Sequence, residues 1–137
     1  EMVDQGRREG DVAADIKTIF EKCDVRRGQA VFICQNPSFD RVFFSQLISP
    51  DEQEELNWPY HWLDLASMHW GRTIADGEML PWVTGFSKDQ IAQTYGLPAE
   101  AAPHRAMGGV DHLILCYDQV IGFPANAEVL ESPTPRN

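Results

Sequence analysis

The sequence is poor in cysteine, in basic residues and in long hydrophobic runs, and each shortage argues against a class of protein. Three cysteines among 137 residues, with no Cys-x-x-Cys pair, argue against a disulfide scaffold and for a reducing compartment. The longest uncharged apolar runs, such as AVFICQ and HLILCY, are far shorter than the roughly 20 residues of a membrane-spanning helix. We therefore expect a cytoplasmic protein with no membrane partner.

The shortage of basic residues limits how the chain could meet nucleic acid. It has 11 Lys and Arg against 21 Asp and Glu, a net charge of −10, whereas broad binding to a phosphate backbone needs cations. A small acidic pocket remains compatible with this charge, because divalent cations bound by its carboxylates reverse the local potential. The charge thus favours processing the end of a strand over coating its length.

The length and the overall composition predict one soluble domain. A chain of 137 residues with 43% hydrophobic and 23% charged residues is ordinary for a globular protein. The opening residues, EMVDQGRREGD, have no secretory signal, and the Glu at position 1 leads us to expect a processed product or a piece of a longer protein. Residues 1–122 form the predicted domain. The Pro-, Asn-, Glu- and Ser-rich residues 123–137 are predicted to be a mobile tail.

Hydrophobic periodicity and capping signals predict an α/β order of helices and strands, with only two strands. Seven stretches carry these signals outside the last helix. The first six are a helix over 11–24, a strand over 30–34, a helix opened by Ser38, a short acidic helix over 50–56, a strand over 60–63 and a helix over 64–70. After a loop over 72–85, the seventh is a helix from Ser87 to Gly96. Two strands make a poor sheet, so some strands are either unrecognised or absent from this chain.

The last helix, which Gly122 ends, is expected to bury one apolar face. The residues at helical spacing on that face are Met107, Val110, Leu113, Ile114, Tyr117 and Ile121. Earlier in the chain, Phe39, Val42, Phe43 and Leu47 are expected to line one side of the helix that follows the first strand. The three cysteines also lie in stretches that we interpret as core.

Three stretches in order resemble the DEDD exonuclease superfamily, in the branch that has a catalytic histidine. The family's second motif, a strand leading to Asn, a short gap and Phe-Asp, is similar to VFICQNPSFD, which gives Asn36, Phe39 and Asp40. The stretch LDLASM follows, with Asp64 opening a helix. The third motif, His-x4-Asp, is approached by PHRAM, which gives His104.

The resemblance implies a fold and a chemistry. Members have a ribonuclease H-like α/β fold and remove nucleotides from 3′ ends of single-stranded DNA or RNA with two divalent ions, Mg²⁺ or Mn²⁺. By resemblance, Asp40 is a metal ligand and His104 the general base. Asn36, Phe39 and Arg105 become candidate substrate-binding residues, with Arg105 placed to steady a phosphate.

The chain departs from the family pattern in two places. The first motif, Asp-x-Glu on the opening strand, has no counterpart, so only the back part of the fold is expected. The final metal-binding Asp is replaced, because Gly109 lies five residues after His104. Asp111 is the substitute candidate metal ligand, but it lies about 200° further around the helix and would serve only if Gly108 and Gly109 loosen the helix start.

Two functions therefore stay open. One is a 3′-to-5′ exonuclease-like domain, whose choice among DNA, RNA and short oligonucleotides the sequence does not reveal. The other is a non-catalytic remnant that keeps the back half of the fold and acts as a protein-interaction module, binding a protein partner through its aromatic-rich acidic surface. In either case, a part-sheet with an unpaired edge favours pairing with a second copy or another chain. Each candidate also has a structural interpretation: Asp40 as a helix-stabilising first-turn aspartate, His104 and Arg105 as surface residues, and Phe39 as core. Aromatic residues between 58 and 70 suit either base stacking or packing.

Overall fold

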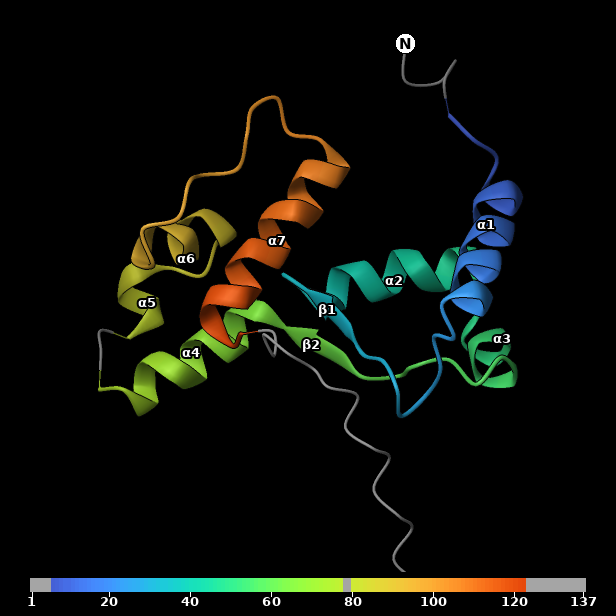
Figure 1. Cartoon of the computed structure of the whole chain (residues 1–137), viewed down its shortest axis with the longest axis horizontal. Coiled ribbons are helices and arrows are strands. Elements are labelled where there is room, and N and C mark those ends of the chain that lie inside the picture. The colour runs from blue at the N-terminus through green and yellow to red at the C-terminus, as the bar shows by residue number, and fades with distance from the viewer. Residues whose placement is uncertain (1–5, 78–79, 123–137) are drawn as a thin grey trace, which may run out of the picture.

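The computed structural model describes residues 6–77 and 80–122 and shows a mixed α/β chain that is mostly helical (Figure 1). Its helices are α1 (Glu9–Lys22), α2 (Pro37–Leu47), α3 (Pro50–Glu55), α4 (Leu65–Ala75), α5 (Pro81–Thr84), α6 (Lys88–Thr94) and α7 (Ala106–Val120). Its strands are β1 (Phe32–Cys34) and β2 (Trp62–Asp64). The predicted α/β order is confirmed. The tail predicted over 123–137 lies outside the described residues.

The two strands pair in parallel, with Phe32 opposite Trp62 and Cys34 opposite Asp64. Parallel pairing requires a crossover, and the chain makes it through α2 and α3. The carboxyl ends of β1 and β2 therefore lie side by side, where α2 and α4 begin (Figure 1).

The hydrophobic interior is divided into two clusters at opposite ends of this sheet. One is formed where α4, α6 and α7 meet, with Leu65, Ile91, Ala92, Cys116 and Val120 buried. The other contains Ala13, Ile48 and Trp58, with the partly buried Ile16, Phe20, Phe44 and Leu47 packed against it. Aromatic contacts of Phe32 with Phe20, Phe44 and Trp62 connect the second cluster to the strands.

Helix starts follow local capping chemistry. The Ser49 side chain accepts from the backbone N–H of Glu52, and Ser87 and Gln90 form a complete capping box, as the sequence predicts. The predicted cap at Ser38 is wrong. The helix begins earlier, at Pro37, because proline is favoured in the first turn, and Asn36 is its N-cap residue.

Several predicted bounds are also corrected. The helix predicted to stop at Gly71 continues to Ala75, because a helical glycine costs only about 1 kcal/mol and neighbouring residues pack. The expected loop over 72–85 consequently contains the end of α4 and the short α5. The strand expected over 30–34 begins at Phe32, and the strand expected over 60–63 is shifted to Trp62–Asp64. Both strands are half-buried, not buried on both faces.

The predicted buried face of α7 is right for Leu113 and Tyr117, which pack against the cluster of α4, α6 and α7, and wrong for the other four residues. The helix packs on α4 and α6 through His112, Cys116 and Val120, and His112 is accommodated because its Nε2 bonds to the carbonyl of Pro98 at 2.9 Å. The predicted core residues on the opposite face, Met107, Val110, Ile114 and Ile121, are exposed.

The exposure of side chains on α2 and of two cysteines also differs from the burial that the sequence predicts. Phe39, Val42 and Phe43 are exposed, whereas Phe44 and Leu47 pack inward. Of the cysteines, Cys116 is buried, Cys34 is half-buried and Cys23 is exposed. None of the described helices has the length and hydrophobicity needed to cross a bilayer.

Candidate functional site

A pocket of about 470 Å³ lies at the carboxyl ends of the two parallel strands. This is the edge of a parallel sheet at which ligands bind in open α/β folds. The residues that line it come from the ends of both strands, from α4 and from the start of α6: Gln35, Asn36, Asp64, Ala66, Ser67, Trp70, Phe86 and Ser87. The pocket thus includes Asn36 and Asp64, two residues of the sequence motifs.

Three helices begin at this pocket. Asn36, Asp64 and Ser87 are the N-cap residues of α2, α4 and α6, and all three line it. The amino end of a helix carries unsatisfied N–H groups and partial positive charge. The positive ends of three helices therefore lie at a pocket that no Lys or Arg lines, although the N–H groups of Ala66 and Gln90 are already bonded by the side chains of Asp64 and Ser87.

Asp64 is held in place by its own helix. One carboxylate oxygen accepts from the backbone N–H of Ala66 at 2.9 Å, and the other accepts from the Ser67 hydroxyl at 2.6 Å. These bonds use both oxygens to cap α4. Asp64 consequently supplies negative charge to the pocket floor while serving a structural role.

Gln35 presents an acceptor that has no hydrogen-bond partner within residues 6–77 and 80–122. Its amide nitrogen donates to the carbonyl of Phe86 at 2.7 Å, which fixes the orientation of the side chain. Its amide oxygen is buried and has no hydrogen-bond partner among the described residues. Because leaving such a group unsatisfied costs about 1–3 kcal/mol, the site favours a ligand with a hydroxyl or amino donor.

An aromatic wall forms one side of the pocket. The rings of Trp70 and Phe86 meet edge to face, with centroids 6.2 Å apart. Trp82 packs against the far side of Trp70 at 5.6 Å. Trp70 and Phe86 are 38% and 41% exposed, so flat ligands can reach them.

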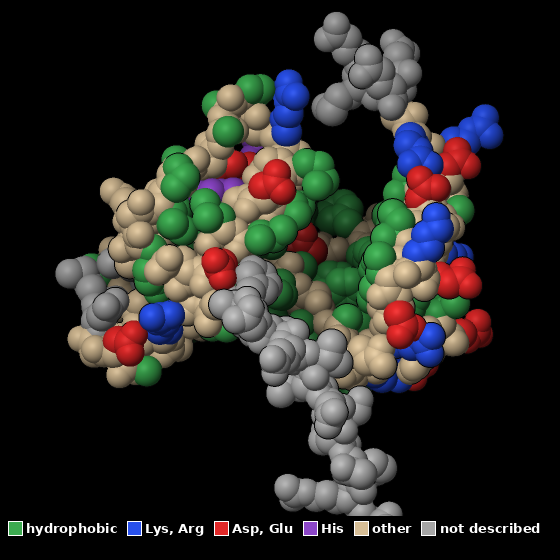
Figure 2. All heavy atoms as spheres, in the orientation of Figure 1, with side chains coloured by type: hydrophobic (Ala, Val, Ile, Leu, Met, Phe, Trp, Pro, Cys, Tyr) green, Lys and Arg blue, Asp and Glu red, His purple; other side chains and the backbone are tan. Residues whose placement is uncertain are grey.

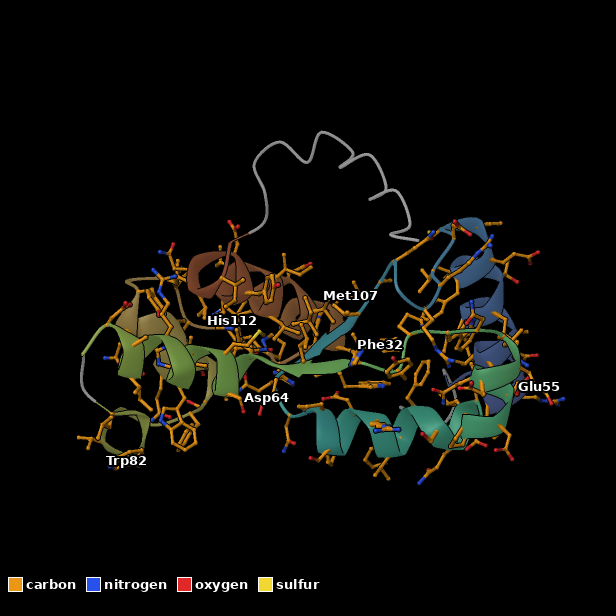
Figure 3. All side chains as sticks on the ribbon, turned by 90° about the horizontal axis from the view of Figure 1, so that it is seen from below. Phe32, Glu55, Asp64, Trp82, Met107 and His112 are labelled. Carbon is orange, nitrogen blue, oxygen red and sulfur yellow. The ribbon has the colours of Figure 1, made fainter. Side chains whose placement is uncertain are left out.

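Asp40 lies beside the pocket, next to Cys34. Burial, the charge of Asp40, a hydrogen bond to Asp40 and the charge of Asp64 together raise the pKa of the Cys34 thiol to about 12. Two carboxylates therefore act on one thiol at the strand ends, near the labelled Asp64 in Figure 3. Phe39, the predicted substrate contact, is 63% exposed and packs on Phe43.

His104 belongs to a different group of charges. Its Nδ1 lies 2.5 Å from a carboxylate oxygen of Glu100, whose other oxygen is 2.7 Å from Lys88 Nζ. The hydrogen bond from Lys88 is the main cause that lowers the pKa of Glu100. His104 is 78% exposed and is not among the pocket residues, so the structure does not bring it to the pocket.

The surroundings of Gly109 leave little room for a side chain at this position. A Cβ on Gly109 would lie 3.3 Å from Glu100 Oε1 and 3.5 Å from Lys88 Nζ, and Lys88 also donates to the Gly109 carbonyl at 2.9 Å. A side chain at 109 would therefore crowd the Lys88–Glu100 pair, and Glu100 would have to shift by a few tenths of an ångström. Sequence reasoning missed this pair, because the two residues lie in different elements and no spacing rule links them.

The remaining candidates do not complete a metal centre. Asp111 is exposed on α7, and Arg105 is the exposed N-cap residue of that helix without a side-chain cap bond. Within residues 6–77 and 80–122, no group of three or more His, Cys, Asp or Glu side chains could hold a metal ion. Asp40 and Asp64 both lie near Cys34, but Asp64 is engaged as a cap, so the donor set does not fit two divalent ions.

Comparison with known proteins gives no match: no family model, no curated protein and no solved structure matches the chain.

Proposed function

We propose that the pocket binds the terminal nucleotide of a single-stranded nucleic acid, in a domain of the DEDD exonuclease type with the back part of a ribonuclease H-like fold. The main support for this proposal is that Asn36, Asp64 and the Trp70–Phe86 wall lie in one pocket at the ends of parallel strands. The ordered motifs of the sequence support the same assignment.

The pocket chemistry suits a nucleoside at a strand end. A base can stack on Trp70 or Phe86, since stacking on aromatic rings tolerates every base. The free amide oxygen of Gln35 accepts from a sugar hydroxyl or a base amino group. The carboxylates of Asp64 and Asp40 repel a long phosphate backbone, which restricts binding to an end.

Hydrolysis by this chain alone is not part of the proposal. The exonuclease reaction needs two metal ions, and the described side chains do not provide their ligands. The proposed activity is recognition of an end, and His104 and Arg105 have no assigned chemical step in it.

Binding of a 5′-labelled single-stranded oligonucleotide tests the proposal. Replacing Trp70 by Ala should weaken binding roughly tenfold, because stacking of one base is worth about 1–3 kcal/mol. Tyr60→Ala is the matched control, since Tyr60 is an exposed aromatic residue away from the pocket. Equal affinity of the native chain and Trp70→Ala would contradict the proposal.

The same oligonucleotide with Mn²⁺ tests for cleavage. We expect no shortening, and no difference among the native chain, Asp40→Ala and His104→Ala. Degradation that both substitutions abolish would show instead that this chain carries the complete reaction.

A second candidate is a protein-interaction module, and the exposed apolar face of α7 favours it. Met107, Val110 and Ile114 are 67%, 44% and 50% exposed on one helix, which is unusual for a face without a partner. Calorimetric titration with Mn²⁺ tests this remnant interpretation. Tight binding of two ions per chain would overturn it in favour of an intact exonuclease.

A further inference from the structure

We infer that β1 accepts an added β-strand from a separate polypeptide, an extended apolar segment with basic residues at its ends. The inference deepens the second candidate function, on which it rests, and it is independent of nucleotide binding. Its basis is the juxtaposition of a free strand edge with the exposed apolar face of α7.

The free edge belongs to the side of β1 that faces away from β2. The N–H of Phe32 donates to the carbonyl of His61 at 3.0 Å, toward β2. In a strand, neighbouring residues direct their backbone groups to opposite sides, so the N–H and C=O of Ile33 face away from β2. The described residues contain only these two strands, and their sheet order is β1-β2, which leaves Ile33 without a strand partner among them.

Apolar walls flank this edge. Figure 2 shows a hollow between α7 and α1 with hydrophobic side chains along both walls and on its floor, and Figure 1 places β1 at its base. Exposed hydrophobic residues of these elements are Ile19 on α1, Val31 before β1, and Met107, Val110 and Ile114 on α7. Surfaces of this kind are covered in stable parallel sheets, because both faces of such sheets are normally packed.

Charge indicates the chemistry of the added segment. On a helical wheel, Asp111 projects within about 60° of Met107 and Ile114. Asp111 is exposed, and α7 contains neither Lys nor Arg. A segment with apolar residues in the hollow and Lys or Arg at its ends therefore complements both the apolar surface and the negative charge of this wall.

The shape of the hollow selects an extended segment over a second copy of the chain. Figure 2 shows the hollow between α7 and α1, and the ribbon of β1 lies at its base in Figure 1. A second copy has the same two walls around its own β1, so the walls would collide before the edges paired. A single extended strand is narrow enough to enter, and main-chain hydrogen bonds to the edge then provide affinity.

A labelled peptide, KVTVTVTVK, provides the test with the full chain. We expect saturable binding by fluorescence polarisation at low salt, weakened in 0.5 M NaCl because exposed charges are then screened. The control peptide KVTVPVTVK should bind at least severalfold more weakly, since proline removes a ladder donor and disrupts the strand. Similar affinities for both peptides, or binding of neither, would overturn the inference.

Two substitutions locate the peptide. Ile114→Glu on α7 should weaken peptide binding roughly tenfold by removing an apolar contact and adding a charge. Ile74→Glu on α4 is the matched control, because Ile74 is 48% exposed and Ile114 is 50% exposed. Equal loss in both variants would refute the location. Oligonucleotide binding should survive Ile114→Glu, and peptide binding should survive Trp70→Ala, so failure of either role is recognised separately.

Hydrogen exchange at the Ile33 amide identifies any other occupant of the edge. In the chain alone we expect fast exchange, and slow exchange after the peptide is added. Protection in the chain alone that rises with protein concentration, with dimers in sedimentation, would show a second copy on the edge and overturn the inference. Protection independent of concentration would assign the edge to the chain's own residues and would also overturn it.

Discussion

At the scale of single residues, the pKa of the Cys34 thiol depends on the carboxylates at the strand ends. Burial first, and then Asp40 and Asp64, disfavour the thiolate and raise the pKa of Cys34 to about 12. Near pH 8 its thiolate fraction is therefore on the order of a thousandfold below that of an ordinary cysteine, whose pKa is about 8.5. Cys23 is exposed and serves as an internal reference within the same chain.

We predict that iodoacetamide modifies Cys34 far more slowly than Cys23 between pH 7 and pH 9, measured by mass spectrometry of peptides. Asp40→Asn should speed the reaction of Cys34, because removing the negative charge lowers the pKa of the thiol, although burial keeps it above the ordinary value. Asp51→Asn, an exposed aspartate on α3, is the control. A Cys34 rate unchanged by Asp40→Asn would contradict the placement of Asp40 beside the thiol.

Other residue positions show what sequence alone could predict. The positions of Asn36, Asp40 and Asp64 after the strands were predictable, because the carboxyl ends of parallel strands meet at one edge. The contact of His104 with Glu100 was not predictable from the sequence, because it depends on how the loop before α7 lies against α6. Glu100 itself has no sequence signal.

At the scale of elements, the first turn of α7 packs against the ion pair Lys88–Glu100. Both side chains are mostly buried, 15% and 11% exposed, and Gly109 leaves room for them. A Cβ on the adjacent Gly108 would have nothing within 4 Å of it, although this glycine lies on the same helix turn. The two glycines thus form a natural comparison.

We predict that Gly109→Asp lowers the free energy of unfolding by about 1–3 kcal/mol, the usual range for crowding and an added charge at a packed site. The new carboxylate would meet Glu100, a like charge. Gly108→Asp is the control and should change stability little. Urea unfolding at pH 7 measures both, and equal stability of the two variants would contradict the crowding at position 109.

The bounds of some elements depend on residues close in sequence, and the bounds of others depend on distant residues. The starts of α3 and α6 were predictable, because Ser49 and Ser87 make their capping bonds within three residues. The bounds of β1 and β2 were not, since strand length depends on a partner distant in sequence. The buried face of α7 was mistaken in part for the same reason: an apolar stripe identifies a face, and only packing with α4 and α6 decides whether that face is covered.

At the scale of the whole molecule, two hydrophobic clusters stand in place of one continuous core. Leu65 belongs to the cluster of α4, α6 and α7, and Ile48 belongs to the cluster that includes α1 and Trp58; both side chains are fully buried. The sheet between the clusters has only two short strands among the described residues. Stability is therefore expected to differ between the two ends of the molecule.

We predict that Leu65→Ala costs about 2–5 kcal/mol and removes hydrogen-exchange protection chiefly from α6 and α7. Ile48→Ala should have the reverse pattern, with the larger loss in α1 and α2. Native-state hydrogen exchange resolves the two regions. Equal loss of protection throughout the chain in both variants would show one cooperative unit instead.

The parallel pairing of β1 with β2 has a consequence for biosynthesis. The pocket draws residues from both sides of the α2–α3 crossover and from the start of α6, so it stays incomplete until the start of α6 has been synthesised. Local helices can form early, whereas the pocket must wait for the slow closure of a long loop. A nascent chain paused between β1 and β2 exposes an unpaired strand, and this is the stage at which a chaperone would be needed most.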